Sequence, residues 1–326
     1  MLCAAMLAMC LPTWGAEAPV SRPVVLKLGH GLDISHPVHK AMVFLADRVK
    51  EKSAGRMQVQ IFPSEQLGNE KECIEALQLG YLAMTKTSSA PMEGFVPQMQ
   101  VFGIPYLFRD SEHLWKVLNG PIGKKLLLAG ESKRLRGLCY YDAGARSFYA
   151  KKPIHTPSDL AGMKIRVQQS DLWVALLEAM GANATPMPYG EVYTALQQKT
   201  VDGEENPVAI VYDAKFYEVQ KFYSLTGHVY SATMLVTNKK FLDKLPADLR
   251  KIVTDAARRY VVEQRKLSDK QEGEFLGLLK KAGMKVNDVT PAEKTAFVKA
   301  TLPVYDSFKD VLGADLIETA KKVAGD

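Results

Sequence analysis

The chain has 326 residues, 47% of them hydrophobic, which is enough for one large or two medium globular domains. Its formal net charge of +6 is moderate, and Lys and Arg are scattered between acids instead of forming a basic stripe. The densest basic stretch, KKLLLAGESKRLRG, is typical of a solvated helix face, so the composition argues against a nucleic-acid-binding protein.

Residues 1–18 are apolar and small, with no charge before Glu17, which predicts a signal peptide and export to the periplasm. Ala16 and Ala18 resemble the small residues of a cleavage site, and the segment is too short to span a bilayer comfortably. A basic start is missing, so the true start codon stays open. A lipid anchor on Cys10 is disfavoured because Met9 is too large for the preceding position. No later segment has the apolar length of a membrane-spanning helix.

Two cysteines, Cys73 and Cys139, lie outside the predicted signal peptide. Cys73 occupies an apolar position at helical spacing and Cys139 a strand-like run, so two buried free thiols are the default expectation. A single disulfide between them is the alternative in an oxidising compartment, and the sequence leaves that choice open.

The first part of the chain alternates between period-2 and period-3.6 patterns of apolar residues. The helix pattern that starts at His36 places Val38, Met42 and Leu45 on one face, and Gly55 is positioned to end it. The patterns predict, in order, a strand from Val24, a helix over 36–55, a half-buried strand over 56–62, a helix over 69–80 and a strand over 82–86.

The later part of the chain continues this alternation. Thr156 is a candidate helix N-cap, with Pro157 at the first helical position and Asp159 three residues on. The patterns further predict a short strand over 164–167, a helix over 170–181, a very long helix from Pro246 to about Leu279, and a C-terminal helical region after a capping box at 290–294.

Alternation of strands and helices predicts an α/β fold with mostly parallel sheets. No repeat, low-complexity tract or flexible linker is present. Two domains without a linker imply that the chain crosses between them more than once, and the long helix is one way to bridge both.

Signatures of catalysis are missing from the sequence, which contains no GxSxG, no P-loop and no CxxC. GHGLDI starts like a dinucleotide fingerprint, but Ile34 stands where the third glycine should be. His36 and His39 are three residues apart without a third ligand in register, so we expect neither a metal site nor a cofactor. His30 and His36 are equally compatible with a ligand cleft and with a capped or surface histidine.

Two arginines and an asparagine form the strongest candidate binding group. Arg146 lies in a glycine-containing turn, and Arg166 lies on the short strand KIRV. A guanidinium binds a carboxylate through two parallel hydrogen bonds, and the Asn206 amide adds a further polar contact. On pattern alone, each arginine is as compatible with a surface or structural role as with binding.

Six segments of the sequence resemble the motifs of one known family, in their residues and in their order along the chain. They are IFPSEQLGNEKE, FGIPYLFRD, GLCYYDAGARSFY, LAGMKIRV, GANATPMPYGEVYTALQQKTVDGEENP and KFYEVQKF. The chain resembles, from about Val24 to its end, the solute-binding proteins of tripartite ATP-independent periplasmic (TRAP) transporters, the DctP family. The run from Gly181 to Phe222 is the most specific part.

The resemblance implies a two-lobed α/β solute-binding fold in which the lobes close around an organic acid and a long helix bridges both. It places residues 24–143 and 232–271 in lobe I, and 144–231 and 272–326 in lobe II. It implies a periplasmic receptor, not an enzyme, that acts as a monomer and delivers its ligand to the small and large membrane subunits of a TRAP permease.

The resemblance also implies the ligand contacts. Arg166 would bind the ligand carboxylate in a bidentate salt bridge, Arg146 and Asn206 would assist, and Tyr189 would line the cleft. The opposite lobe would present residues that select the ligand: Glu70, Lys86, Ser88, Ser89, His30, His36 and Asp142.

This polar set suits a polyhydroxylated ligand, because each buried hydroxyl needs a partner. GHGLDxSHPVH, AMTK and YYDAGARSFY are similar to members that bind hexuronates and related sugar acids. Sialic acid is disfavoured, since its binders carry an acid at the position of Ser88. Lys86 would also suit a second carboxylate, so C4-dicarboxylates, aldarates and keto acids stay open, as does a role as a ligand-dependent sensor partner. The exact ligand, its anomer and the affinity are left open.

Overall fold

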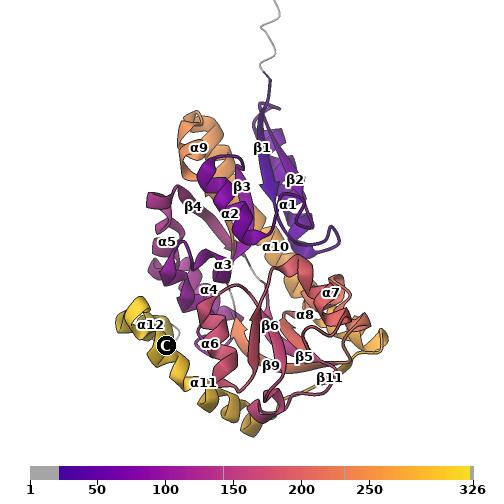
Figure 1. The fold of residues 1–326 in the computed structure, drawn as a ribbon. Coiled ribbons are helices and arrows are strands. Elements are labelled where there is room, and N and C mark those ends of the chain that lie inside the picture. The colour runs from indigo at the N-terminus through magenta and orange to yellow at the C-terminus, as the bar shows by residue number, and fades with distance from the viewer. Residues whose placement is uncertain (1–21, 142, 231, 324–326) are drawn as a thin grey trace, which may run out of the picture.

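The computed structural model describes residues 22–141, 143–230 and 232–323 and shows a mixed α/β protein of two lobes (Figure 1). The predicted signal peptide and Asp142 lie outside the described residues. Each lobe is built on its own sheet: five strands in lobe I, six in lobe II. In Figure 1 the five-stranded sheet lies in the upper half and the six-stranded sheet in the lower half.

The sheet of lobe I has the strand order β2-β1-β3-β10-β4. Parallel pairing joins β1 to β2 and β3, whereas β10 runs antiparallel to β3 and β4. Its strands are β1 Val24–Gly29, β2 Met57–Phe62, β3 Met84–Ser88, β4 Leu135–Tyr141 and β10 Thr233–Asn238.

The sheet of lobe II has the strand order β11-β9-β5-β8-β6-β7. Strand β5 runs antiparallel to β8 and β9, while β6 is parallel to β7 and β8. Its strands are β5 Ala145–Ala150, β6 Lys164–Val167, β7 Asn183–Pro186, β8 Gly203–Asn206, β9 Phe222–Tyr230 and β11 Lys285–Asn287.

Strand β10 returns to lobe I after five strands of lobe II, so the chain crosses between the lobes more than once. The expected α/β class and two lobes are confirmed. The sheets are mostly parallel, as expected: in each sheet all strands run in one direction except one, β10 in lobe I or β5 in lobe II, which is antiparallel to both neighbours. An antiparallel strand needs no helical crossover to reach its neighbour, so the chain can pass from one lobe to the other next to such a strand. The exact lobe boundaries stay a prediction.

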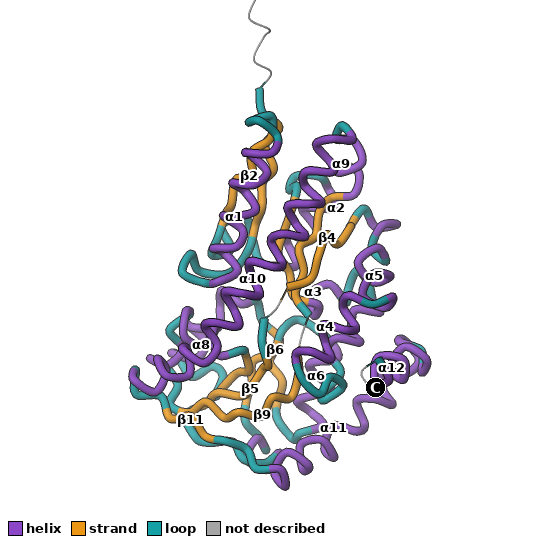
Figure 2. Tube along the Cα trace, turned by 180° about the vertical axis from the view of Figure 1, so that it is seen from behind, coloured by secondary structure: helices purple, strands orange, loops and turns teal. Residues whose placement is uncertain are grey.

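Helix α10 (Ala247–Lys281) has 35 residues and bridges both lobes, as the sequence predicts. It packs on α1 and β4 of lobe I and on α8 and β11 of lobe II (Figure 2). An apolar stripe of its first half faces the core of lobe I, where Leu249, Val253 and Tyr260 are buried. A single rigid element therefore connects the two lobes.

The remaining helices cover the sheets and fill the space between them. Helix α1 ends after Lys52, and Gly55 adopts the left-handed conformation and donates to Lys50 O, as expected for a glycine at a helix end. The others are α1 Pro37–Lys52, α2 Glu70–Leu79, α3 Ser89–Met92, α4 Ser111–Asn119, α5 Pro121–Leu128, α6 Asp171–Ala179, α7 Val192–Gln197, α8 Val208–Asp213, α9 Lys239–Lys244, α11 Pro291–Leu312 and α12 Ala314–Lys322.

Both described cysteines are buried and unbonded, which resolves the choice that the sequence left open. Burial raises the pKa of the Cys73 thiol to about 11 and that of Cys139 to about 12. Both side chains are therefore neutral thiols at neutral pH and behave as small apolar core residues.

No helix among the described residues is long and apolar enough to cross a membrane. The residues described contain no group of histidines, cysteines and acids arranged to hold a metal ion.

Candidate functional site

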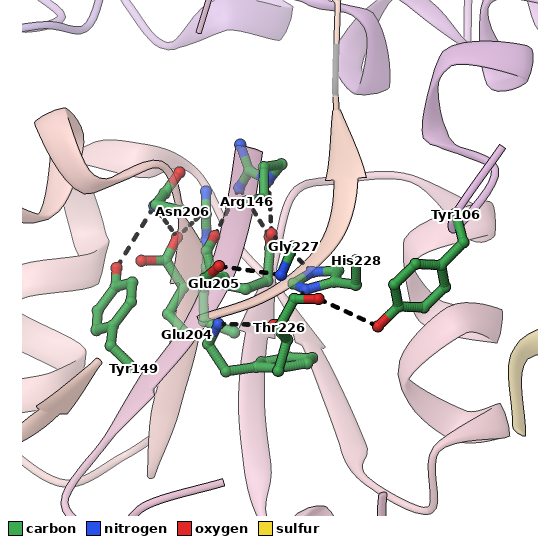
Figure 3. Close-up of polar contacts among 12 residues, drawn as sticks. Tyr106, Arg146, Tyr149, Glu204, Glu205, Asn206, Thr226, Gly227 and His228 are labelled. Atoms are coloured by element: carbon green, nitrogen blue, oxygen red, sulfur yellow. Dashed lines mark hydrogen bonds and ion pairs between the residues drawn. The ribbon is translucent and has the colours of Figure 1, made fainter. Parts of the chain in front are cut away.

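The two predicted arginines and Asn206 come together at adjoining strands of lobe II. Arg146 lies on β5, Arg166 on β6, and Asn206 ends β8, which pairs with both β5 and β6. All three side chains are at least 97% buried. The same network contains two fully buried acids of β8, Glu204 and Glu205 (Figure 3). We call these five residues the carboxylate clamp.

Arg146 is fixed mainly by Glu205. Its Nε lies 2.5 Å from Glu205 Oε2, and its Nη2 donates to Glu205 Oε1 at 2.7 Å and to the Glu205 carbonyl at 2.6 Å (Figure 3). Its guanidinium also lies over the ring of Trp173, 5.0 Å from the centroid. Burial opposes the charge of Arg146, but the carboxylate of Glu205 holds its pKa above the ordinary value. Arg146 is therefore a rigid permanent cation.

Arg166 keeps part of its donor capacity. Its Nε and Nη2 donate to the Met187 carbonyl at 3.1 and 2.8 Å, and its Nη1 donates to Glu204 Oε1. Burial lowers the pKa of Arg166 to about 10, so it is still charged at neutral pH. A guanidinium carries five N–H groups, and three have partners among the described residues. Two remain for a ligand.

Asn206 supports both sides of the clamp. Its Nδ2 donates to Glu204 Oε1 at 2.7 Å and to the Tyr149 hydroxyl at 3.4 Å, and its carbonyl accepts from Tyr223 at 3.0 Å. Next to it, His228 Nε2 lies 3.3 Å from Glu205 Oε2, and burial lowers the pKa of His228. His228 is thus a neutral partner of Glu205.

The predicted polar residues of lobe I form a second group. Lys86 on β3 is buried, and its Nζ lies 2.6 Å from Oε1 of Glu70, the first residue of α2. Ser88 donates to Glu70 through its backbone N–H at 3.1 Å, and its hydroxyl lies 3.5 Å away. The Ser89 hydroxyl is buried without a partner among the described residues. This group, the lobe I wall, therefore contains the ion pair of Lys86 with Glu70 and one hydroxyl, that of Ser89, without a hydrogen-bond partner among the described residues.

His30 and His36 are buried near Lys86 in lobe I, and both hold one tautomer. The Leu32 N–H donates to His30 Nδ1 and the Val38 N–H donates to His36 Nδ1, each at 3.1 Å. The proton of each neutral ring consequently lies on Nε2. His30 Nε2 donates to His39 Nδ1 at 3.0 Å, whereas His36 Nε2 has no partner among the described residues.

Burial, followed by nearby cations including Lys86, lowers the pKa of His36 to about 3. An unfolded histidine titrates near 6.5, so between these values only the unfolded chain takes up the proton. Stability from a neutral His36 is present above pH 6.5 and is lost as the pH falls. We expect His36→Asn, which keeps an acceptor for the Val38 N–H, to remove about 2 kcal/mol of the stability loss between pH 7 and pH 5.

Urea unfolding of the wild type and of His36→Asn at both pH values measures this difference. An equal loss of stability in the two proteins would show that His36 is not held neutral by the fold.

A small cavity of about 20 Å³ joins the two groups. Arg166, Tyr189 and Gln168 line it from lobe II, and Glu70 and Asn69 line it from lobe I. Tyr189 packs edge-on against Phe216 and lines this cavity, and its contact with a ligand stays a prediction. Ligand pockets typically measure about 300–1,000 Å³, so the lobes are closed on the site in this conformation.

A carboxylate that the sequence interpretation missed closes one edge of the cleft. Glu65 accepts a hydrogen bond from the backbone N–H of Gly190 in lobe II, and a Cβ at Gly190 would lie 2.2 Å from Glu65 Oε2. Ser64 and Glu65 both have positive φ, 52° and 57°, which L-residues adopt at a cost. This strained loop brings Glu65 across the cleft. The strain and the close approach have no signature that a single sequence reveals.

Two more contacts join the lobes. The Ser35 hydroxyl donates to Asp213 Oδ1 at 3.2 Å, and Ser170, the N-cap of α6, bonds Glu93 Oε2. Burial raises the pKa of Glu93 to about 8 and that of Asp213 to about 6. These acids were not predicted as site residues, and their contacts hold the closed arrangement.

The buried, charged Arg166 lines a cavity between two lobes, with the buried Arg146 on a neighbouring strand pair, as in a two-lobed receptor for an anion. The family model described as DctP, bacterial extracellular solute-binding protein, family 7, matches residues 28–310. The chain belongs to this family, as its motifs predict.

Individual relatives support the same assignment. The 2,3-diketo-L-gulonate-binding periplasmic protein YiaO of Escherichia coli is 35% identical over 302 residues, 91% of this chain and 92% of that protein. A TRAP solute-binding protein from Bradyrhizobium, solved with galacturonate, is 40% identical with a TM-score of 0.87, over 91% of this chain and 99% of that chain. A TRAP solute-binding protein from Sulfurospirillum deleyianum, solved with succinate, is 35% identical with a TM-score of 0.89. The match covers 93% of this chain and 100% of that chain.

Proposed function

We propose that this protein is a periplasmic receptor that binds a hexuronate or related sugar acid and delivers it to a TRAP membrane permease. The observation that carries the proposal is the charged Arg166, which keeps two N–H groups in a cleft that it shares with Glu70 of the other lobe. Proteins similar to this chain bind galacturonate and 2,3-diketo-L-gulonate, and another binds succinate.

Arg166 is the principal partner of the ligand carboxylate in this proposal. Arg146 donates three times to Glu205 and keeps the two N–H groups of Nη1, but it does not line the cavity that Arg166 lines. A charged hydrogen bond contributes roughly 1.5–3 kcal/mol, so two such bonds from Arg166 are enough to anchor an acid.

The wall formed by Glu70 and Lys86 favours a sugar acid over a dicarboxylate. Lys86 is compensated by Glu70 at 2.6 Å, so a second ligand carboxylate would compete with Glu70 for it. Ser89 Oγ and His36 Nε2 are buried without a partner among the described residues, and in this proposal they pair with ligand hydroxyls. A ligand with one carboxylate and several hydroxyls satisfies both ends of the cleft.

Ligand entry requires the lobes to separate, since the closed cavity holds only about 20 Å³. The Glu65–Gly190 and Ser35–Asp213 contacts join different lobes and would break together on opening. Binding would then stabilise the closed arrangement by mass action. No step of this cycle changes the ligand chemically, and recovery of unchanged ligand after prolonged incubation tests that part.

A thermal-shift panel tests the choice of ligand. Galacturonate, glucuronate, galactonate, succinate and a short 2-oxo acid are added separately at equal concentration. A ligand present at 100 times its Kd stabilises the folded state by about 2.7 kcal/mol, so binders stand out clearly. We expect one or more of the sugar acids to give the largest shift. Stabilisation by succinate alone would refute the sugar-acid assignment while leaving a dicarboxylate receptor.

A further inference from the structure

The carboxylate clamp contains as many acids as guanidiniums. Glu204 and Glu205 are 0% exposed; Glu204 contacts Arg166, and Glu205 contacts Arg146. If both acids were ionised, the clamp would be electrically neutral, and a bound carboxylate would add an uncompensated buried charge. Such a charge is very costly in a buried site.

The two acids have very different surroundings. Both oxygens of Glu205 are engaged, with Arg146 on each and His228 3.3 Å from Oε2. Glu204 uses only Oε1, which accepts from Arg166 and from Asn206 Nδ2, while its Oε2 is buried without a partner among the described residues. A carboxylate carries acceptor sites on both oxygens, so Glu204 is poorly solvated as an anion.

We propose that Glu204 is a neutral carboxylic acid in the closed receptor, which leaves the clamp with one net positive charge for its anionic ligand; the ligand half of this statement rests on the proposed function. Both arginines keep their charge and Glu205 is the single anion. The proton comes from solvent and lies on Oε2, the oxygen that has no hydrogen-bond partner among the described residues.

The surroundings of Glu204 agree with this assignment. Burial, and then the negative charge of Glu205, raises the pKa of Glu204 well above its ordinary value. Burial acts in the same direction on Glu205, but Arg146 and His228 hold its pKa below the ordinary value. The titratable or charged groups that surround Glu204 are Glu205 on β8, Arg146 and Tyr149 on β5, Arg166 on β6, and Tyr223 and His228 on β9.

The direct test is infrared difference spectroscopy of the wild type against E204Q, at neutral pH and without ligand. We expect a carbonyl stretching band of a protonated carboxyl that is present in the wild type and missing from E204Q. Loss of an ionised carboxylate band instead would overturn the proposal. Because this experiment uses no sugar acid, its result stands even if the proposed function fails.

Calorimetric titration with galacturonate adds the matched pair E204Q and E205Q. An amide can stand in for a protonated carboxyl but not for an ionised one that fixes Arg146, so we expect E205Q to weaken binding at least about 10-fold more than E204Q does. A loss in E204Q as large as that in E205Q would contradict the neutral state, and so would an E204Q protein that fails to fold. Absence of binding by the wild type would count against the proposed function alone.

Discussion

Replacing Arg166 by lysine is expected to weaken binding of the sugar acid at least about 30-fold, and replacement by alanine at least about 100-fold. Arg166 donates to the Met187 carbonyl and to Glu204, and it keeps two further N–H groups for the ligand. Lysine has three N–H groups on one atom and cannot serve these partners in the same plane. Isothermal titration calorimetry with galacturonate measures both losses.

The variant Arg56→Lys, the same exchange at an exposed position away from the cleft, is the control for Arg166→Lys. Arg56 is half exposed and pairs with Asp248 on the outside of lobe I. Exposed ion pairs contribute about 0–1 kcal/mol, so Arg56→Lys should leave the affinity unchanged. Unchanged affinity in Arg166→Lys and Arg166→Ala would remove Arg166 from the site.

Replacing Trp173 by alanine is expected to destabilise the protein by about 3–5 kcal/mol and to weaken ligand binding as well. Trp173 is completely buried on α6, and its ring lies under the guanidinium of Arg146 and edge-on to His228. Its loss leaves a large cavity and removes the cation–π contact that holds Arg146 in place. Urea unfolding followed by far-ultraviolet circular dichroism measures the stability.

Trp173→Phe is the matched variant, because it keeps an aromatic face for Arg146 at a smaller volume. We expect it to lose less stability than the alanine variant and to retain most of the ligand affinity. If both variants were as stable as the wild type, Trp173 would not be part of the core that supports the clamp.

Much of the fold could be predicted from local patterns. The apolar stripe of α10, the capping box at Thr290 and the left-handed Gly55 each act within a few residues, so the sequence shows them directly. The reversed direction of β5 and β10 within their sheets was not predictable in this way. It depends on which strands become neighbours, and β10 pairs with strands more than 90 residues earlier in the chain.

The site shows the same division. Arg146, Arg166 and Asn206 were candidates because their side chains suit carboxylates and their motifs resemble a known family. The roles of Glu204 and Glu205 were missed, although they stand beside Asn206 in GEENP. Their pairing with the arginines is set by the register of β8 against β5 and β6, where Ser147 is opposite Asn206 and Ile165 opposite Gly203. Register is a property of the assembled sheet.

The central claim is that the carboxylate clamp anchors an acid between the lobes. A crystal structure of the protein with bound galacturonate tests it most directly. We expect the ligand carboxylate within hydrogen-bond distance of Arg166, with the ligand hydroxyls toward Glu70 and Ser89 of the other lobe. A ligand bound with its carboxylate away from Arg166, or bound outside the cleft between the lobes, would contradict the account.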